Sequence, residues 1–207
     1  MTDQEIKDRI MTQGGELFKR YGIRSVTMDD LASHLSISKK TIYQFFKDKK
    51  EVVSASVRYM LDKELNELYE ITENSKDVVE ELVLLSEYFK KMTRQMNPTL
   101  LFDMKKYHPE AWNLYLNRKE TCYRSRLEAV LLRGKEQGVI RDGIHPYIIS
   151  RMRMEVVEMG FNPDIFPSEE YDISEVQMNL FDHFVHGIVT PKGLELMDQC
   201  LKEKGLH

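Results

Sequence analysis

Cysteine, proline and long apolar runs are all scarce in this 207-residue sequence. Its two cysteines, Cys122 and Cys200, are too few and too isolated to form a disulfide framework, so we expect two reduced thiols in a cytoplasmic protein. No apolar run reaches the roughly 20 residues that a membrane-spanning helix needs, and the acidic, polar first residues lack the core of a signal peptide. We therefore predict no membrane partner.

Motifs of catalysis and metal binding are also missing. The sequence has no G-x-S-x-G, no glycine-rich phosphate loop and no H-E-x-x-H. Asp29 and Asp30 suit the first turn of a helix, where the helix dipole favours acids, better than a catalytic pair. His183 and His186 would suit two metal ligands, but no third ligand with convincing spacing accompanies them. We predict no catalytic residue, no metal site and no cofactor.

What the sequence does have is helical periodicity. With 42% hydrophobic and 31% charged residues, the chain can build a core. Its apolar residues recur three and four positions apart, and no segment alternates like a strand for long. The predicted fold class is therefore all-α. The expected helices cover about residues 3–21, two short stretches within 27–50, then 50–72, 78–96, 99–106, 109–137, 146–160, 172–189 and 194–203.

The segment 27–50 has the pattern of two short helices with a tight break between them. Thr27 and Ser38 are each placed to cap one helix with a side-chain oxygen. The first helix has the apolar stripe Met28, Leu31, Ala32 and Leu35. In the second, Ile42 and Phe46 lie four residues apart and face the same core. This arrangement is typical of a helix-turn-helix, in which the second helix enters the DNA major groove.

The outer side of the second helix has the chemistry that such a role requires. It presents cations, hydroxyls and an amide, on Lys39, Lys40, Thr41, Tyr43, Gln44 and Lys47. These groups bind phosphates and base edges. Although the net charge is −4, residues 1–50 carry ten basic and seven acidic side chains, whereas residues 51–207 carry twenty and twenty-seven. The positive charge is thus concentrated where a phosphate contact surface needs it.

Together with the preceding helix, this segment resembles the DNA-binding domain of the TetR (tetracycline-repressor) family of bacterial transcription regulators. The matching residues are Leu17-Phe18, Gly22, Val26-Thr27, Leu31-Ala32, Ile37-Ser38, Thr41-Ile42-Tyr43, Phe46 and Lys49. The sequence departs from the family at Ser36, where a glycine is usual, and at Phe45, where a tyrosine or histidine is frequent. The resemblance implies a three-helix DNA-binding domain at 1–48 and a larger helical effector-binding and dimerisation domain at 49–207.

The resemblance also implies roles for individual residues in binding double-stranded DNA. We expect base edges or the adjoining phosphates to be contacted by Lys39, Lys40, Thr41 and Gln44. We expect the DNA backbone to be held by Tyr43, Lys47, Lys49 and the capping Thr27, with Ser38 in the same surface. Because one recognition helix touches too few bases, such a reader binds as a symmetric dimer to a palindromic operator.

A wide apolar band on two late helices gives the dimer a candidate interface. The family forms its dimer through a four-helix bundle, which the resemblance places on residues 146–160 and 172–189. The expected contact residues are Met152, Val156, Met159, Leu180, Phe181, Phe184, Val185 and Ile188. Part of the same band must serve the intramolecular core, because an apolar stripe at helical spacing is first of all a core signal.

Large and adaptable side chains between residues 89 and 161 suggest an effector pocket. Ligand cavities are apolar and aromatic with a few polar groups, and methionine suits variable ligands. The candidates are Phe89, Met92, Met96, Phe102, Tyr107, Trp112, Tyr115 and Tyr123. By spacing alone such stripes are more often plain core, so it is the resemblance to an effector-binding family that favours a pocket.

The function predicted from the sequence is a ligand-responsive repressor, released from its operator by an unknown small molecule. Two alternatives stay open. A DNA-bound architectural or adaptor protein would use its C-terminal domain to recruit a protein partner, and it would be insensitive to metabolites. An enzyme or carrier with a vestigial reader domain would fail to bind DNA even at low salt, where phosphate contacts are strongest.

Overall fold

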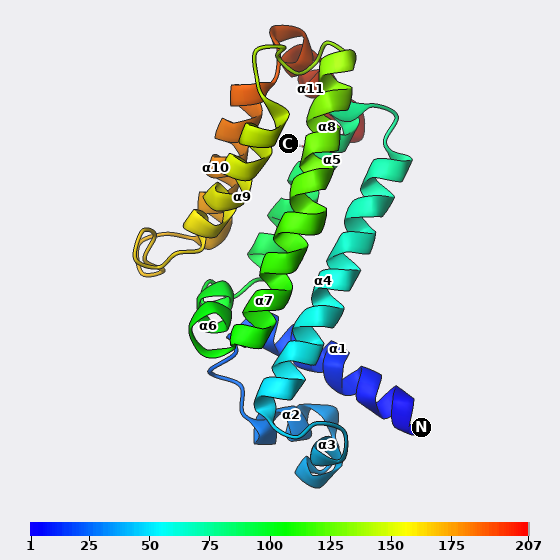
Figure 1. Cartoon of the computed structure of the whole chain (residues 1–207), viewed down its shortest axis with the longest axis vertical. Coiled ribbons are helices and arrows are strands. Elements are labelled where there is room, and N and C mark those ends of the chain that lie inside the picture. Colours follow the sequence, from blue (N-terminus) through cyan, green and yellow to red (C-terminus); the bar gives the residue numbers. More distant parts are fainter. Residues whose placement is uncertain (207) are drawn as a thin grey trace. The chain divides into compact units, whose positions relative to one another are not determined.

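The computed structural model describes residues 1–206, and within them it is built from helices with no β-strand (Figure 1). The helices are α1 (Asp3–Tyr21), α2 (Met28–Leu35), α3 (Lys39–Phe45), α4 (Lys49–Asn74), α5 (Val78–Arg94), α6 (Leu100–Tyr107), α7 (Pro109–Arg118), the π-helix η1 (Lys119–Tyr123), α8 (Arg124–Glu136), α9 (Pro146–Gly160), α10 (Ile173–Ile188) and α11 (Pro191–Lys204). The predicted all-α class is confirmed.

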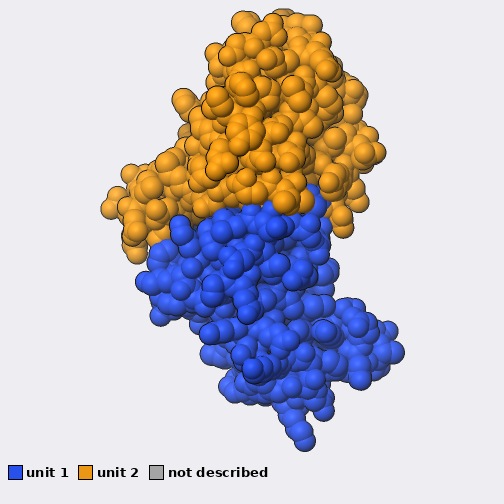
Figure 2. Space-filling model, viewed as in Figure 1, with its two compact units in different colours: residues 1–65, 95–118 blue, residues 66–94, 119–207 orange. Residues whose placement is uncertain are grey.

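The chain forms two compact units, coloured separately in Figure 2. Unit 1 comprises residues 1–65 and 95–118, and unit 2 comprises residues 66–94 and 119–207. Helix α4 contributes residues to both of them. Among the described residues, no helix is both long and apolar enough to cross a membrane.

In unit 1, the first three helices close on a small apolar core. Ile10, Phe18, Leu31 and Ile42 are all fully buried in it. Burying side chains of this size contributes about 1.5–3 kcal/mol each. Helix α1 starts at a capping box, in which Thr2 and Glu5 each bond the other's backbone N–H. These contacts place α2 and α3 firmly on α1.

The two glycines in the middle of α1 allow α4 to pack closely against it. A Cβ atom at Gly14 would lie 3.2 Å from Ser56 Oγ, and one at Gly15 would lie 3.2 Å from Met60 Cγ. Both contacts are tighter than an ordinary van der Waals contact. The close approach therefore explains why α1 carries residues that cost helix propensity, about 1 kcal/mol each relative to alanine.

The end of α1 and the loop after it are tied to α6. The backbone N–H of Asn97 donates to Lys19 O at 2.6 Å, and that of Arg24 donates to the buried carboxylate of Asp103 at 3.2 Å. Gly22 has φ +81°, and a Cβ there would lie 2.9 Å from Thr99 Oγ1. Residues 95–118 thus fold with the first three helices as one unit.

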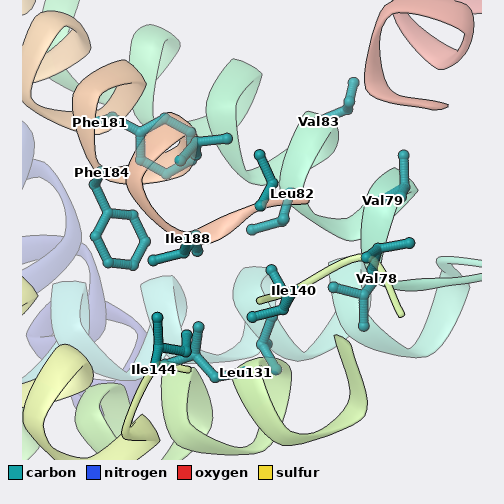
Figure 3. Packing of buried hydrophobic residues seen from close by; sticks show 14 of the residues in the cluster. Val78, Val79, Leu82, Val83, Leu131, Ile140, Ile144, Phe181, Phe184 and Ile188 are labelled. Atoms are coloured by element: carbon teal, nitrogen blue, oxygen red, sulfur yellow. The ribbon is translucent and has the colours of Figure 1, made fainter. Parts of the chain in front are cut away.

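The core of unit 2 is built from α5, α8, α10 and the segment before α9 (Figure 3). Leu82, Leu131, Ile140 and Ile188 are each at most 2% exposed. An isolated antiparallel bridge joins Ile140 to Val189. These contacts bring the chain entering α9 and the chain leaving α10 together.

Two predicted helix boundaries were wrong. The expected single helix over 109–137 is interrupted by the π-helix, whose Lys119 is only 4% exposed and bonds to acids on α9. The last helix starts at Pro191 and not at Leu194. Proline needs no N–H donor at the first position of a helix, and Thr190 Oγ1 accepts a hydrogen bond from the N–H of Gly193 at 3.0 Å.

Candidate nucleic-acid interface

Helix α2 begins as the sequence predicts. The hydroxyl of Thr27 accepts a hydrogen bond from the N–H of Asp30 at 3.1 Å, and the carboxylate of Asp30 accepts one from the N–H of Thr27 at 2.8 Å. Hydrogen bonds from Thr27 to the carboxylate lower the pKa of Asp30. Thr27 is exposed, but its side chain is used here in capping. The four predicted apolar residues of α2 are all buried.

The turn between α2 and α3 depends on an unusual serine. Ser36 has φ 54° and ψ 39°, a left-handed conformation that favours glycine. The N–H of Ser36 donates to Ser33 O, and that of Ile37 donates to Ala32 O at 3.0 Å. The carbonyls at the end of α2 are satisfied in this way. Ser38 then caps α3 by accepting the N–H of Thr41 at 3.0 Å.

Helix α3 is held from one side only. Ile42 is fully buried and Phe46, directly after the helix, is 2% exposed. On the other side Lys40, Tyr43 and Gln44 are exposed, and Tyr43 is 46% exposed despite its large ring. The structure thus presents amine, phenol and amide groups together on a short, well-anchored helix, with the exposed Lys47 just beyond it. We call Lys40, Tyr43, Gln44 and Lys47 the α3 surface.

Three other predicted DNA contacts have partners within the domain. Lys39 Nζ lies 2.8 Å from the carboxylate of Asp29, and this hydrogen bond raises the pKa of the lysine. Both side chains are solvent-exposed, so a phosphate can compete for Lys39. Thr41 is half-buried and its hydroxyl lies 2.8 Å from that of Ser38.

Lys49 differs from its expected role. Its ammonium donates to Ile23 O at 2.6 Å and is half-buried, and this burial lowers its pKa. The bond ties the start of α4 to the loop before α2. A cation used inside the domain is poorly placed to hold a DNA phosphate, so we leave Lys49 out of the interface proposed below.

Comparison with known proteins supports this geometry. A sequence model described as bacterial regulatory proteins of the tetR family matches residues 10–55, which span α1 to the start of α4. Residues 10–55 are thus similar to the DNA-binding domain of the TetR family. The matches support a helix-turn-helix DNA-binding protein of transcription regulation.

Similarity to known transcription regulators extends over nearly the whole chain. The uncharacterized HTH-type transcriptional regulator YvaF of Bacillus subtilis is 29% identical over 181 residues, which cover 87% of this chain and 94% of that protein. A TetR-family regulator from Agrobacterium tumefaciens has the same fold, with a TM-score of 0.74 at 18% identity over 91% of this chain and all of the other. A putative regulator from Saccharomonospora viridis, solved with choline, has a TM-score of 0.72 at 20% identity, over 90% and 99% of the two chains.

The TetR-family dimer residues predicted from the sequence fall into two groups. Phe181, Phe184, Val185 and Ile188 are 2–6% exposed and belong to the core of unit 2. Helix α10 turns this side inward against α5, so these four side chains serve the core of the unit, and their part in a dimer stays a prediction. Met152 is 46% exposed, and the other three residues are half-buried: Val156, Met159 and Leu180.

One exposed apolar residue of α9 was missing from the predicted dimer residues. Ile148 is 58% exposed and lies one helical turn before Met152 on α9. The four-residue spacing of the two side chains is the signal that could have identified it. Which apolar residues of α10 are buried in the single chain could not be judged from the sequence, because this helix is apolar on more than one face.

The eight predicted effector contacts are all half-buried. Those in unit 2 are Phe89, Met92 and Tyr123, and those in unit 1 are Met96, Phe102, Tyr107, Trp112 and Tyr115. The ring of Phe89 lies 5.9 Å from that of Phe181, and the guanidinium of Arg24 lies 5.0 Å from the ring of Tyr107. Their use by a ligand stays a prediction.

Among the described residues, no group of three or more His, Cys, Asp or Glu side chains is arranged to hold a metal. His183 and His186 are both exposed on α10, and the imidazole of His186 lies 3.2 Å from the carboxylate of Asp182.

Proposed function

We propose that this chain is a transcriptional repressor that binds a palindromic operator as a homodimer and is released by a small-molecule effector. The observation that carries the proposal is the α3 surface, whose polar groups face away from the core while Ile42 and Phe46 anchor the helix. The amide of Gln44 suits an adenine edge, and the lysines and the Tyr43 hydroxyl suit phosphates. Since its partner is chromosomal DNA, we expect the protein to act in the cytoplasm.

The exposed apolar side chains of α9 support the homodimer. Ile148 and Met152 are among the large hydrophobic residues left exposed in the single chain. Helices α9 and α10 pack side by side, so that two copies of the pair would form a four-helix bundle (Figure 1). Burial of this band would remove its apolar area from water, the main favourable term in association. Paired recognition helices would then meet half-sites about 34–36 Å apart.

Similarity to ligand-bound regulators supports an effector. Besides the choline complex, a solved structure of similar fold is the regulator FadR of Bacillus subtilis in complex with stearoyl-CoA, with a TM-score of 0.59 and 17% identity. An effector that prefers one conformation of the repressor would shift the population toward it, by no more than its difference in affinity between the two conformations.

The proposal is tested by a binding selection from fragmented genomic DNA of the source organism with the purified full-length protein. We expect recovered fragments to share an inverted repeat and the protein to bind it as a dimer. Recovered fragments without a common sequence would contradict a sequence-specific repressor. Binding that no metabolite extract weakens would favour the adaptor alternative, in which the C-terminal helices recruit a protein.

A further inference from the structure

The most unusual charged group in unit 2 is a buried arginine on α9. Arg153 is 6% exposed, and its terminal nitrogen Nη1 has no hydrogen-bond partner among the described residues. Burial lowers the pKa of Arg153 to about 10, so the guanidinium is still charged at neutral pH. A buried charge without a counter-ion is strongly unfavourable, and proteins avoid it unless the charge is used.

A second buried cation shows how this unit normally satisfies such a charge. Lys119 is 4% exposed, yet its ammonium contacts the carboxylates of both Glu155 and Glu158, the former at 2.8 Å. These are the two acids of α9, the helix that also carries Arg153. On α8, Glu128 is held by Arg124 and by the hydroxyl of Ser150. These three acids are therefore already engaged by other groups, and none of them pairs with Arg153.

The direct neighbours of Arg153 are aromatic. Its guanidinium carbon lies 5.4 Å from the ring centre of Phe181 and 5.4 Å from that of Phe184, both on α10. Such cation–π contacts offset part of the cost of burial. They supply no hydrogen-bond acceptor, however, and leave the buried Nη1 donor without a partner.

We propose that Arg153 is the recognition group for a monocarboxylate ligand whose apolar body packs against Phe181 and Phe184. The inference rests on the proposed function, because it specifies the chemical class of the effector. One guanidinium matches the single charge of a carboxylate and can bind it through two parallel hydrogen bonds. A bound carboxylate would supply the missing counter-ion of Arg153 and remove the free-energy penalty of its unpaired charge, and this gain would contribute to the affinity for the ligand.

The test compares acids with their uncharged amides. Butyrate, octanoate, dodecanoate, benzoate and phenylacetate, and the matching primary amides, are added to the full-length protein, and the melting temperature is measured. We expect at least one acid to raise it by several degrees while its amide does not, because ligand that binds only the folded state stabilises it. Inorganic phosphate is expected to give no shift, since it has no apolar body to pack against the two rings.

Two variants that each lose one positive charge test whether the stabilisation by acids depends on Arg153. Arg153→Met should remove the difference between acid and amide, whereas Arg151→Met, exposed on the same helix, should keep it. Arg153→Lys should retain part of the shift as a single-point cation. Circular dichroism and operator binding confirm that each variant is folded.

The outcomes separate this inference from the repressor proposal. If the acids stabilise the wild type no more than their amides, or stabilise Arg153→Met equally, the carboxylate assignment is overturned even if operator binding is intact. If an acid binds through Arg153 but does not release DNA, the ligand site stands and effector-controlled repression does not.

Discussion

At the scale of single residues, the predicted DNA-binding side chains differ in whether they also make a contact within the domain. Lys40, Tyr43, Gln44 and Lys47 project from the domain, whereas Thr27 is used in a cap and Lys49 on a backbone carbonyl. Residue type and spacing were enough to predict which side of α3 faces outward, because Ile42 and Phe46 fix that side. They were not enough for Lys49, since a long flexible side chain can reach a carbonyl 26 positions earlier in the sequence.

The lysines of the α3 surface should control the salt dependence of binding. Replacing Lys40 or Lys47 by alanine should weaken operator binding at all sequences and reduce the slope of log K against log salt by about 1 for each lysine replaced. Fluorescence anisotropy over a series of salt concentrations measures the slope. Lys192→Ala, exposed at the start of α11, is the control and should leave the slope as it is.

Substitutions of Gln44 and Tyr43 should change DNA binding in different ways. Gln44→Ala should relax the preference at one base pair of each half-site, worth about 1–3 kcal/mol. Tyr43→Phe should weaken binding to all operators without changing the preferred base, since a phosphate contact carries no sequence information. A binding selection with each variant distinguishes the two results. An unchanged preference for Gln44→Ala would remove this residue as a base reader.

At the scale of elements, caps and turns were predictable where a local side chain decides them. Thr27 and Ser38 both cap as their positions in the sequence suggested. The π-helix was not predictable, because the burial of Lys119 depends on Glu155 and Glu158, which lie more than thirty residues later. The inward-facing residues of α10 could not be told from surface residues for the same reason, since neighbouring helices decide which apolar face is covered.

The helix-turn-helix turn is expected to gain stability from glycine. Ser36→Gly should raise the free energy of unfolding by about 0.5–1 kcal/mol, because a residue with a Cβ is strained at φ 54°. For a chain of this size the melting temperature should rise by about 2–4 °C per kcal/mol. Ser33→Gly, within α2, should lower it. Calorimetry of both variants provides the measurement, and equal effects of the two would contradict the strain.

At the scale of the whole molecule, the predicted operator requires two copies of the chain. Met152→Glu should place a charge in the exposed apolar band of α9 and shift the protein toward monomer, while the fold is kept because Met152 is outside the core. Analytical ultracentrifugation measures the shift, and operator affinity should fall with it. Tyr59→Glu, exposed on α4, is the control. A stable dimer in both variants would place the interface elsewhere.

The hydrogen bonds from Asn97 to Lys19 and from Arg24 to Asp103 have a consequence for protein engineering. A hybrid regulator made by joining residues 1–48 to another C-terminal domain would lack both bonds, because Asn97 and Asp103 would not be transferred with the first 48 residues. A transplant that also carries residues 49–65 and 95–118 moves donors and acceptors together. The transferable unit is therefore discontinuous in sequence. Hybrids joined only at residue 48 should mostly be unstable.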